Sequence, residues 1–291
     1  ERLIAEALYH RRPVYMGFAS DLAVQPARGS AMPRPAASSD PKALAAATDA
    51  VLDALDSART ACVLPGILVQ RIGARAALQG FIDGSGLPFA TMFMAKSVLD
   101  EQHPQYVGLY DGALMNESVR AFVEGAERVL VVGSPLTDFN TGAFTARLDP
   151  HRTITLAHHH AVVDGKTYAD VELGESLTAL AKRARHRPWK TLMPATLGAA
   201  EGRGDAPITV GALYPRWEAF LKPQDIVVAE TGTVSMCLGF AQLPRGASFH
   251  NQTLWGSIGW ATPAALGIAL AAPGQRVLLF TGEGSHQLTA Q

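Results

Sequence analysis

The sequence predicts an α/β protein with parallel sheets: a doubly wound central domain followed by the first half of a second parallel α/β domain. Short apolar runs, such as residues 128–132 and 277–280, alternate with longer segments of helical periodicity. This alternation is typical of parallel strands joined by crossover helices. Most of the runs end in turns rich in glycine, proline or serine. Of the 291 residues 48% are hydrophobic and 18% charged, enough apolar material to bury two sheets.

Composition excludes several classes of function. The formal net charge of -1 gives no electrostatic basis for binding nucleic acid or an acidic membrane surface. The sequence has neither an apolar run of 18 residues nor a signal peptide, so we expect no membrane association. Cys62 and Cys237 lie far apart in apolar surroundings, which predicts free thiols in a reducing compartment. We therefore expect a cytoplasmic protein.

The first 24 residues are expected to be the closing αβ unit of a domain. Apolar residues between positions 3 and 8 lie on one helical face, and residues 14–18 form an apolar run that predicts a strand. Because the sequence opens at Glu1 within a helical pattern, we expect a chain cut at both ends. Residues 25–39 are rich in Pro, Ala, Gly and Ser without periodicity, and we interpret them as a linker.

The central domain is predicted to span residues 40–185. Asp40 precedes Pro41, and a capping side chain followed by proline at the first helical position is a strong helix start. The buried stripe of that helix runs from Leu44 to Leu55. The expected strands are 61–64, 88–92, 106–109, 128–132 and 153–156, and the expected later helices are 74–82, 116–125 and 173–185.

A third unit is predicted over residues 207–291, after a second linker at 186–206. Its expected elements are a helix at 213–221, a strand at 225–230, a helix at 263–271 and a strand at 277–280. This is about half of a parallel-sheet domain.

The last of these strands ends in a turn suited to a metal-bound anion. The turn reads Gly282-Glu283-Gly284-Ser285, and a helix is expected to begin at His286. The glycines let the backbone approach a ligand, and a helix N-terminus offers unpaired N–H groups to a phosphate. A carboxylate beside that anion makes physical sense if a cation such as Mg²⁺ lies between them.

Two other stretches of the third unit are expected at the same edge of the sheet. Glu230-Thr231-Gly232-Thr233 ends another strand, and between the two turns lie residues 254–267, whose small side chains would let a ring or diphosphate lie on the backbone. Ligands of open α/β sheets bind outside the carboxyl ends of the strands. We expect Glu230 to orient its turn rather than act as an acid or base, and Trp255 and Trp260 to lie in the core.

These motifs together resemble those of the thiamine diphosphate-dependent 2-oxo acid decarboxylases, in the pyruvate, indolepyruvate and phenylpyruvate decarboxylase branch. The resemblance is carried by Ala-Glu-Thr-Gly-Thr (229–233), Leu-Trp-Gly-Ser-Ile-Gly (254–259), Thr-Pro-Ala-Ala-Leu-Gly (262–267) and Gly-Glu-Gly-Ser-His-Gln-Leu-Thr-Ala-Gln (282–291). It extends more weakly over the whole chain. It implies that residues 1–24 are the tail of a pyrimidine-binding domain and that 207–291 are the N-terminal half of a diphosphate-binding domain.

The resemblance also implies roles for matching residues. Glu283 stands where the family has the aspartate that ligates Mg²⁺. Gly256 would meet the aminopyrimidine, and Ile258 would hold the cofactor in its bent shape. The remaining residues implied to contact thiamine diphosphate are Thr231, Gly232, Thr233, Ser257, Gly284 and Ser285. The implied reaction is non-oxidative decarboxylation of a 2-oxo acid to an aldehyde in a homodimer or homotetramer.

Some family features have no match here. The family's second metal ligand, its activating glutamate, its paired histidines and its later catalytic glutamate all fall outside residues 1–291, so no catalytic residue is assigned. We therefore expect this polypeptide alone to be inactive. The alternatives are a non-catalytic assembly or nucleotide-binding module, and a carboligase of the acetolactate synthase type, which the run Trp255-Gly-Ser-Ile-Gly259 disfavours.

His158-His159-His160 is the remaining motif with possible chemistry. Consecutive side chains on a strand point to opposite faces and would not converge on one metal ion. We therefore expect these histidines to be structural or solvent-facing.

Overall fold

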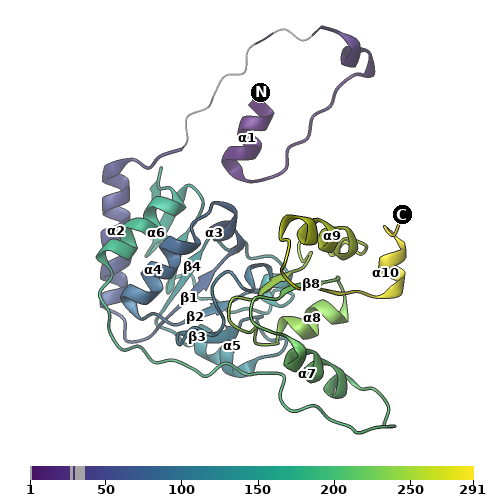
Figure 1. Cartoon of the computed structure of the whole chain (residues 1–291). Coiled ribbons are helices and arrows are strands. Elements are labelled where there is room, and N and C mark those ends of the chain that lie inside the picture. Colours follow the sequence, from purple (N-terminus) through teal and green to yellow (C-terminus); the bar gives the residue numbers. More distant parts are fainter. Residues whose placement is uncertain (1, 27–28, 30–36) are drawn as a thin grey trace.

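The computed structural model describes residues 2–26, 29 and 37–291. Two sheets organise this part of the chain: a seven-stranded sheet in the order β3-β2-β1-β4-β5-β6-β7 and a three-stranded sheet in the order β10-β8-β9 (Figure 1). Helices flank both sheets, and the predicted α/β class is confirmed. No helix among the described residues has the length and apolar character needed to span a membrane.

The first five strands of the larger sheet are parallel. They are β1 (Ala61–Pro65), β2 (Phe89–Thr91), β3 (Tyr106–Leu109), β4 (Arg128–Val132) and β5 (Thr153–Leu156). The expectation of a wholly parallel sheet is wrong at one edge, where β6 (His160–Val163) and β7 (Lys166–Ala169) add an antiparallel hairpin. The chain reverses there through Asp164 and Gly165, both with positive φ, instead of crossing over through a helix.

Helices cover both faces of this sheet. On one face lie α2 (Pro41–Asp56), α3 (Ile67–Arg71), α4 (Arg75–Ser85) and α6 (Leu173–Arg183); on the other lies α5 (Glu117–Glu124). Strand β1 shows why two helical layers are needed, because its residues alternate between them. Val63 packs into the α2 side, whereas Cys62 and Leu64 pack into the α5 side.

The N-terminal segment contains the expected helix but not the expected strand. Helix α1 (Arg2–His10) and the 3-10 helix η1 (Ser20–Val24) flank residues 14–18, which pair with no described strand (purple in Figure 1). Tyr15 is 90% exposed, so the apolar run reflects no buried strand here. Most of the predicted linker at 25–39 lies outside the described residues. The predicted helix start is confirmed, since the Asp40 side chain accepts a hydrogen bond from the Ala43 N–H.

The smaller sheet is parallel throughout. It consists of β8 (Ile226–Ala229), β9 (Ser248–His250) and β10 (Val277–Phe280). Helices α7 (Val210–Phe220) and α8 (Thr233–Gly239) pack on one face and α9 (Ala261–Ala271) on the other. The last helix, α10 (Glu283–Gln287), begins at Glu283 and not at the expected His286, because Gly282 already serves as its N-cap residue.

A buried ion pair joins the two α/β units. The Lys96 ammonium lies 2.9 Å from both Glu101 carboxylate oxygens and donates to the carbonyl of Ala241 at 2.7 Å. Glu101 in turn accepts from the Leu243 N–H. Both charged side chains are 0% exposed. A second contact is close by, where the Phe249 N–H donates to the Ser97 hydroxyl.

The two cysteines are free, as predicted. Cys62 is fully buried, and burial raises the pKa of its thiol to about 12. A thiol with so high a pKa carries almost no thiolate at neutral pH and is therefore inert. Cys237 is half-buried, and burial also raises its pKa.

The histidine run does not lie along a strand as expected. His158 and His159 form a bend between β5 and β6, and only His160 begins a strand. Their rings stack at 3.9 Å between centroids with planes 26° apart, so the expectation that they point to opposite faces is wrong. Burial, and next the neighbouring His159, lower the pKa of His158.

Asp111, which follows β3, has a buried carboxyl group whose oxygens lack hydrogen-bond partners of normal geometry among the described residues. The residue is 3% exposed. Burial raises its pKa to about 7, and the nearby main chain of Gly142 opposes this by less. The folded state therefore favours the protonated form of the Asp111 carboxyl group more than the unfolded state does.

We expect Asp111→Asn to stabilise the protein above neutral pH. A carboxyl pKa that is higher in the folded than in the unfolded state makes stability fall as pH rises from about 4 to about 7 and level off above. The variant should gain about 2 kcal/mol at pH 8 and almost nothing at pH 4. Urea unfolding at both values measures this, with Asp53→Asn, an exposed position on α2, as the control. A gain of equal size at both pH values would refute the titration of Asp111.

Candidate functional site

Three polar turns meet at one edge of the smaller sheet. Strands β8 and β10 are parallel neighbours with Ala229 opposite Phe280, so the turns that follow them begin side by side. Strand β9 pairs on the other side of β8, and the chain after it continues into the loop of residues 251–260. Because all three strands run in the same direction, their carboxyl ends form one edge, where open α/β sheets bind ligands.

Glu230 holds two of these turns together. It is 1% exposed, and one carboxylate oxygen accepts a hydrogen bond from its neighbour, the Thr231 N–H, at 3.1 Å. The other accepts from the N–H groups of Gly259 and Ala261, each at 3.1 Å. A carboxylate occupied by three backbone donors is a positioning group, as predicted for Glu230. It fixes the end of β8 against the loop that enters α9.

The loop after β9 is shaped by further hydrogen bonds that the sequence motifs did not indicate. The Thr231 hydroxyl donates to the carbonyl of Gln252, and the Gln252 side chain accepts from the Trp255 N–H. Gln252 therefore bridges the turn after β8 and the run 254–259. Its amide carries no sequence signal of this role, because any polar residue before a loop would look the same.

The turns contain glycines, beside which a ligand could approach the backbone. Gly232 (φ +133°) and Gly256 (φ +60°) adopt conformations that favour glycine. A Cβ added at Gly232, Gly282 or Gly284 would meet no other atom within 4 Å. The space beside these three glycines is thus free of protein atoms in the described chain.

Glu283 is the exposed first residue of α10, directly after the strand β10 and Thr281-Gly282. Two hydrogen bonds hold the C-terminal segment in place: the Thr289 hydroxyl, just after α10, donates to the Gly259 carbonyl of the loop at 2.6 Å, and His286 of α10 pairs with Thr262 of α9 at 3.0 Å. The carboxylate of Glu283 therefore projects from a turn that is fixed to the same loop that Glu230 holds.

The residues singled out from the sequence thus belong to three turns at one sheet edge. Thr231, Gly256 and Ser285 are half-buried, whereas Gly232, Thr233, Ser257, Gly284 and Glu283 are exposed. Ile258 is 53% exposed. Trp255 is 78% exposed, so its predicted place in the core is wrong, while Trp260 packs against the core beneath α9 as predicted.

This arrangement defines a class: a parallel α/β domain with glycine-containing turns and an exposed carboxylate at the strand ends, suited to a phosphorylated ligand with a cation. Comparison with known proteins shows which family within this class the chain matches. Residues 48–183 match the family described as thiamine pyrophosphate enzyme, central domain. Residues 230–291 match the family described as thiamine pyrophosphate enzyme, C-terminal TPP binding domain.

Several curated proteins are similar over the full chain. Alpha-keto-acid decarboxylase of Mycobacterium ulcerans (strain Agy99) is 35% identical over 297 residues, covering 100% of this chain and 52% of that protein. The proteins of the same name from Mycobacterium avium (strain 104) and Mycobacterium tuberculosis (strain ATCC 25618 / H37Rv) are also 35% identical, and 53% of each is covered. The chain therefore spans about half the length of the curated relatives it matches. The two domain models together match more than half of the chain, which therefore belongs to the thiamine pyrophosphate enzyme family.

Proposed function

We propose that this chain forms part of a decarboxylase that uses thiamine diphosphate and Mg²⁺ to convert a 2-oxo acid to an aldehyde. The observation that carries the proposal is the meeting of the turns at 230–233, 254–259 and 282–285 at one sheet edge, where the buried Glu230 holds the first two together. The relatives' name, alpha-keto-acid decarboxylase, supports the reaction class. Within that class we propose indolepyruvate, phenylpyruvate or pyruvate as the substrate.

The residues at this edge fit the two ends of the cofactor. Thr231, Gly232 and Thr233 on one side, and Gly284 and Ser285 on the other, would bind the diphosphate through backbone N–H groups and hydroxyls. Gly256 and Ser257 would contact the aminopyrimidine. The exposed Ile258 would pack between the rings, a contact that an apolar side chain standing clear of the core can make. When bound, the cofactor supplies the electron sink for loss of CO₂.

Glu283 would bind the Mg²⁺ that neutralises the diphosphate. Its carboxylate is an oxygen donor of the kind that Mg²⁺ prefers, and it lies next to two glycines that leave room for the ion. Glutamate carries one methylene more than the aspartate of the family pattern. Because α10 begins at Glu283, the longer side chain starts from a fixed backbone and can extend toward the diphosphate.

We expect Glu283→Gln to weaken Mg²⁺-dependent binding of thiamine diphosphate at least about tenfold, since a neutral amide is a poor ligand for a hard cation. Calorimetric titration at fixed Mg²⁺ concentration measures the affinity. Asp53→Asn removes one exposed carboxylate on α2 and should bind like the wild type. Equal affinity in Glu283→Gln and wild type would contradict a metal role for Glu283.

We also expect residues 1–291 on their own to release no CO₂ from pyruvate or an arylpyruvate. The one proposed metal ligand here is Glu283, and the family's activating glutamate has no match in these residues. A coupled assay for CO₂ with purified polypeptide, thiamine diphosphate and Mg²⁺ tests this. Robust turnover would overturn this expectation of inactivity. Calorimetry measures binding of the cofactor separately, so the result of one test does not depend on the other.

The proposed assembly is a homodimer or homotetramer in the cytoplasm. Exposed apolar side chains of the loop before α9, of α9 and of the C-terminal segment support an association: Trp255, Ile258, Leu266, Leu270 and Leu288 are all at least 53% exposed. Large apolar surface of this kind is typical of contacts with another polypeptide. The two free cysteines fit the reducing compartment that we predict.

A further inference from the structure

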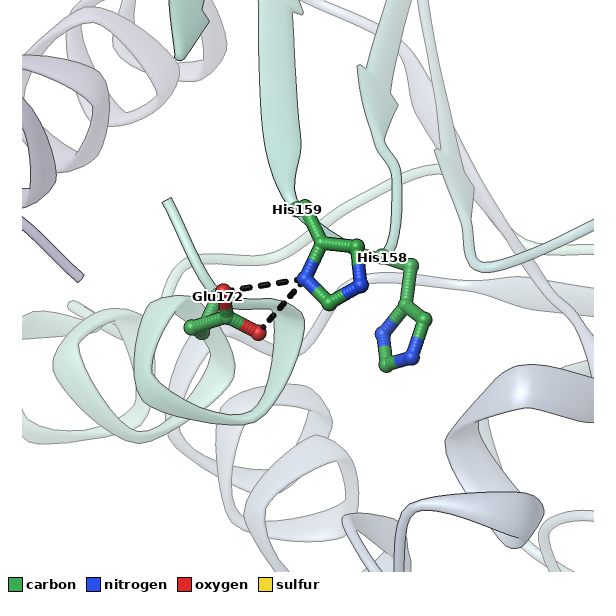
Figure 2. Close-up of side chains that lie close together, drawn as sticks. All are labelled: His158, His159 and Glu172. Carbon is green, nitrogen blue, oxygen red and sulfur yellow. Dashed lines mark hydrogen bonds and ion pairs between the residues drawn. The ribbon is translucent and has the colours of Figure 1, made fainter. Parts of the chain in front are cut away.

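A second cluster of potential ligands lies at the carboxyl end of β5 in the central sheet, where four segments of chain meet. The bend between β5 and β6 carries His158 and His159, and Glu172 precedes α6. Tyr9, at the end of α1, contacts the same place. Figure 2 shows the two imidazole rings side by side, with the Glu172 carboxylate facing His159. The region 37–40 also reaches this place, because the Ser39 hydroxyl accepts from the Glu172 N–H.

Stacking fixes the position of His159. Its ring lies 3.9 Å from that of Tyr9, with planes 7° apart, and 3.9 Å from that of His158. Two rings at this distance must occupy opposite faces of the imidazole, so His159 lies between them. Its side chain is 18% exposed and that of Glu172 is 14% exposed.

Hydrogen bonds then orient the donor atoms. The Nε2 atom of His159 lies 3.1 Å from the Tyr9 carbonyl, and its Nδ1 atom lies 2.9 Å from both carboxylate oxygens of Glu172. A carbonyl only accepts, so Nε2 must donate to it, which leaves Nδ1 directed at Glu172. In a metal-binding histidine, the ring nitrogen that does not bind the metal usually donates a hydrogen bond, for example to a backbone carbonyl, and this bond fixes the orientation of the ring.

His158 is available as a third ligand. Both of its ring nitrogens are buried, and neither has a hydrogen-bond partner of normal geometry among the described residues. Buried polar atoms without partners are uncommon and call for a ligand or an ion. The main chain of Tyr9 interacts with this ring and raises its pKa, but by less than burial lowers it. One ligand atom each from His158, His159 and Glu172 already lie within 4.8 Å of one another.

We infer that His158, His159 and Glu172 form a binding site for a divalent transition-metal ion, of which Zn²⁺ is the best match. Two imidazoles and a carboxylate are donors that Zn²⁺ accepts at about 2.0–2.2 Å, with a fourth position left for water. Donors bound to one such ion lie roughly 3.3 Å apart, so the His158 ring must move inward by an ångström or more. The ion would bind His159 Nδ1, a proton held there would pass to solvent, and the charge of the ion would offset that of Glu172. Mg²⁺ is disfavoured, because it selects oxygen ligands.

Such an ion would tie the end of α1 to the central sheet. The Tyr9 carbonyl bonds to the same imidazole that would hold the metal, and the Tyr9 ring stacks on it. Metal binding fixes the orientation of His159 and thereby the surface on which Tyr9 rests.

Titration of metal-free protein with Zn²⁺, followed by calorimetry, tests the site. We expect one Zn²⁺ per chain, and binding at least about tenfold weaker in His158→Gln and Glu172→Gln. His160→Gln is the matched control, because His160 is the exposed neighbour outside the cluster and should bind like the wild type. Replacing Zn²⁺ by Co²⁺ should give the intense visible absorption of tetrahedral coordination in wild type and His160→Gln only.

His158→Gln decides the result even if Glu172→Gln folds poorly, since the His158 side chain has no hydrogen bond of normal geometry to lose. Its circular dichroism and thermal unfolding should match those of the wild type. Absence of stoichiometric Zn²⁺ binding, or equal binding by His158→Gln and His160→Gln, would overturn the site.

Discussion

Replacing Lys96 by methionine should destabilise the protein by roughly 3–5 kcal/mol, the usual cost of leaving one partner of a buried ion pair uncompensated. Both side chains of the Lys96–Glu101 pair are 0% exposed. Without the ammonium, the Glu101 carboxylate keeps the neutral donors Leu243 N–H and Tyr106 hydroxyl, but no cation that offsets its charge. The carbonyl of Ala241 loses its bond as well, so the contact between the two α/β units weakens from both sides.

Urea unfolding at neutral pH measures this loss. Lys182→Met removes the same charge from the exposed face of α6 and should change stability by less than about 0.5 kcal/mol. The double variant Lys96→Met/Glu101→Met should recover much of the stability, because two apolar side chains need no partner. If Lys96→Met unfolds like the wild type, the pair does not hold the units together.

The second large effect is expected for Glu230→Ala. This change leaves the N–H groups of Thr231, Gly259 and Ala261 without their acceptor, and it should cost roughly 2–4 kcal/mol. The more specific consequence concerns ligand binding. Once the turn after β8 is no longer fixed to the loop before α9, affinity for thiamine diphosphate should fall at least about tenfold.

Glu218→Ala provides a matched control. Glu218 on α7 likewise accepts from two backbone N–H groups, those of Leu197 and Gln242, but it lies away from the three turns. We expect a comparable loss of stability with unchanged affinity for the cofactor. Glu230→Gln should be intermediate, since its amide oxygen can replace one carboxylate oxygen while its NH₂ group faces a donor. Equal loss of affinity in Glu218→Ala and Glu230→Ala would show that affinity follows global stability instead of the turn.

The sequence predicts the parallel part of the fold well, because its signals are local. Buried strands such as β4 appear as unbroken apolar runs, and Asp40-Pro41 marks a helix start by side-chain chemistry alone. The antiparallel hairpin is not among the predicted elements, although Asp164-Gly165, a dipeptide typical of tight hairpin turns, marks it. Residues 14–18 show the opposite error, because their apolar run predicts a strand that the structure does not contain. A strand needs a partner strand to pair with, and the run itself carries no information about one.

The candidate site likewise has features that the sequence predicts and contacts that it does not predict. Its glycines and the carboxylate of Glu283 were recognisable as motifs, because each depends on residues adjacent in sequence. The contacts of Gln252 and the link between Thr289 and Gly259 join residues that are brought together only by folding. The bend at His158 and His159 was likewise hidden, because the assumption of a continuing strand placed their side chains on opposite faces.

Calorimetry with thiamine diphosphate and Mg²⁺, compared with NAD and ADP, tests the central claim most directly. We expect residues 1–291 to bind thiamine diphosphate only when Mg²⁺ is present, to bind it less in Glu230→Ala and Glu283→Gln, and to bind neither nucleotide. Binding of NAD or ADP without any binding of thiamine diphosphate would contradict the proposed function and favour a nucleotide-binding module.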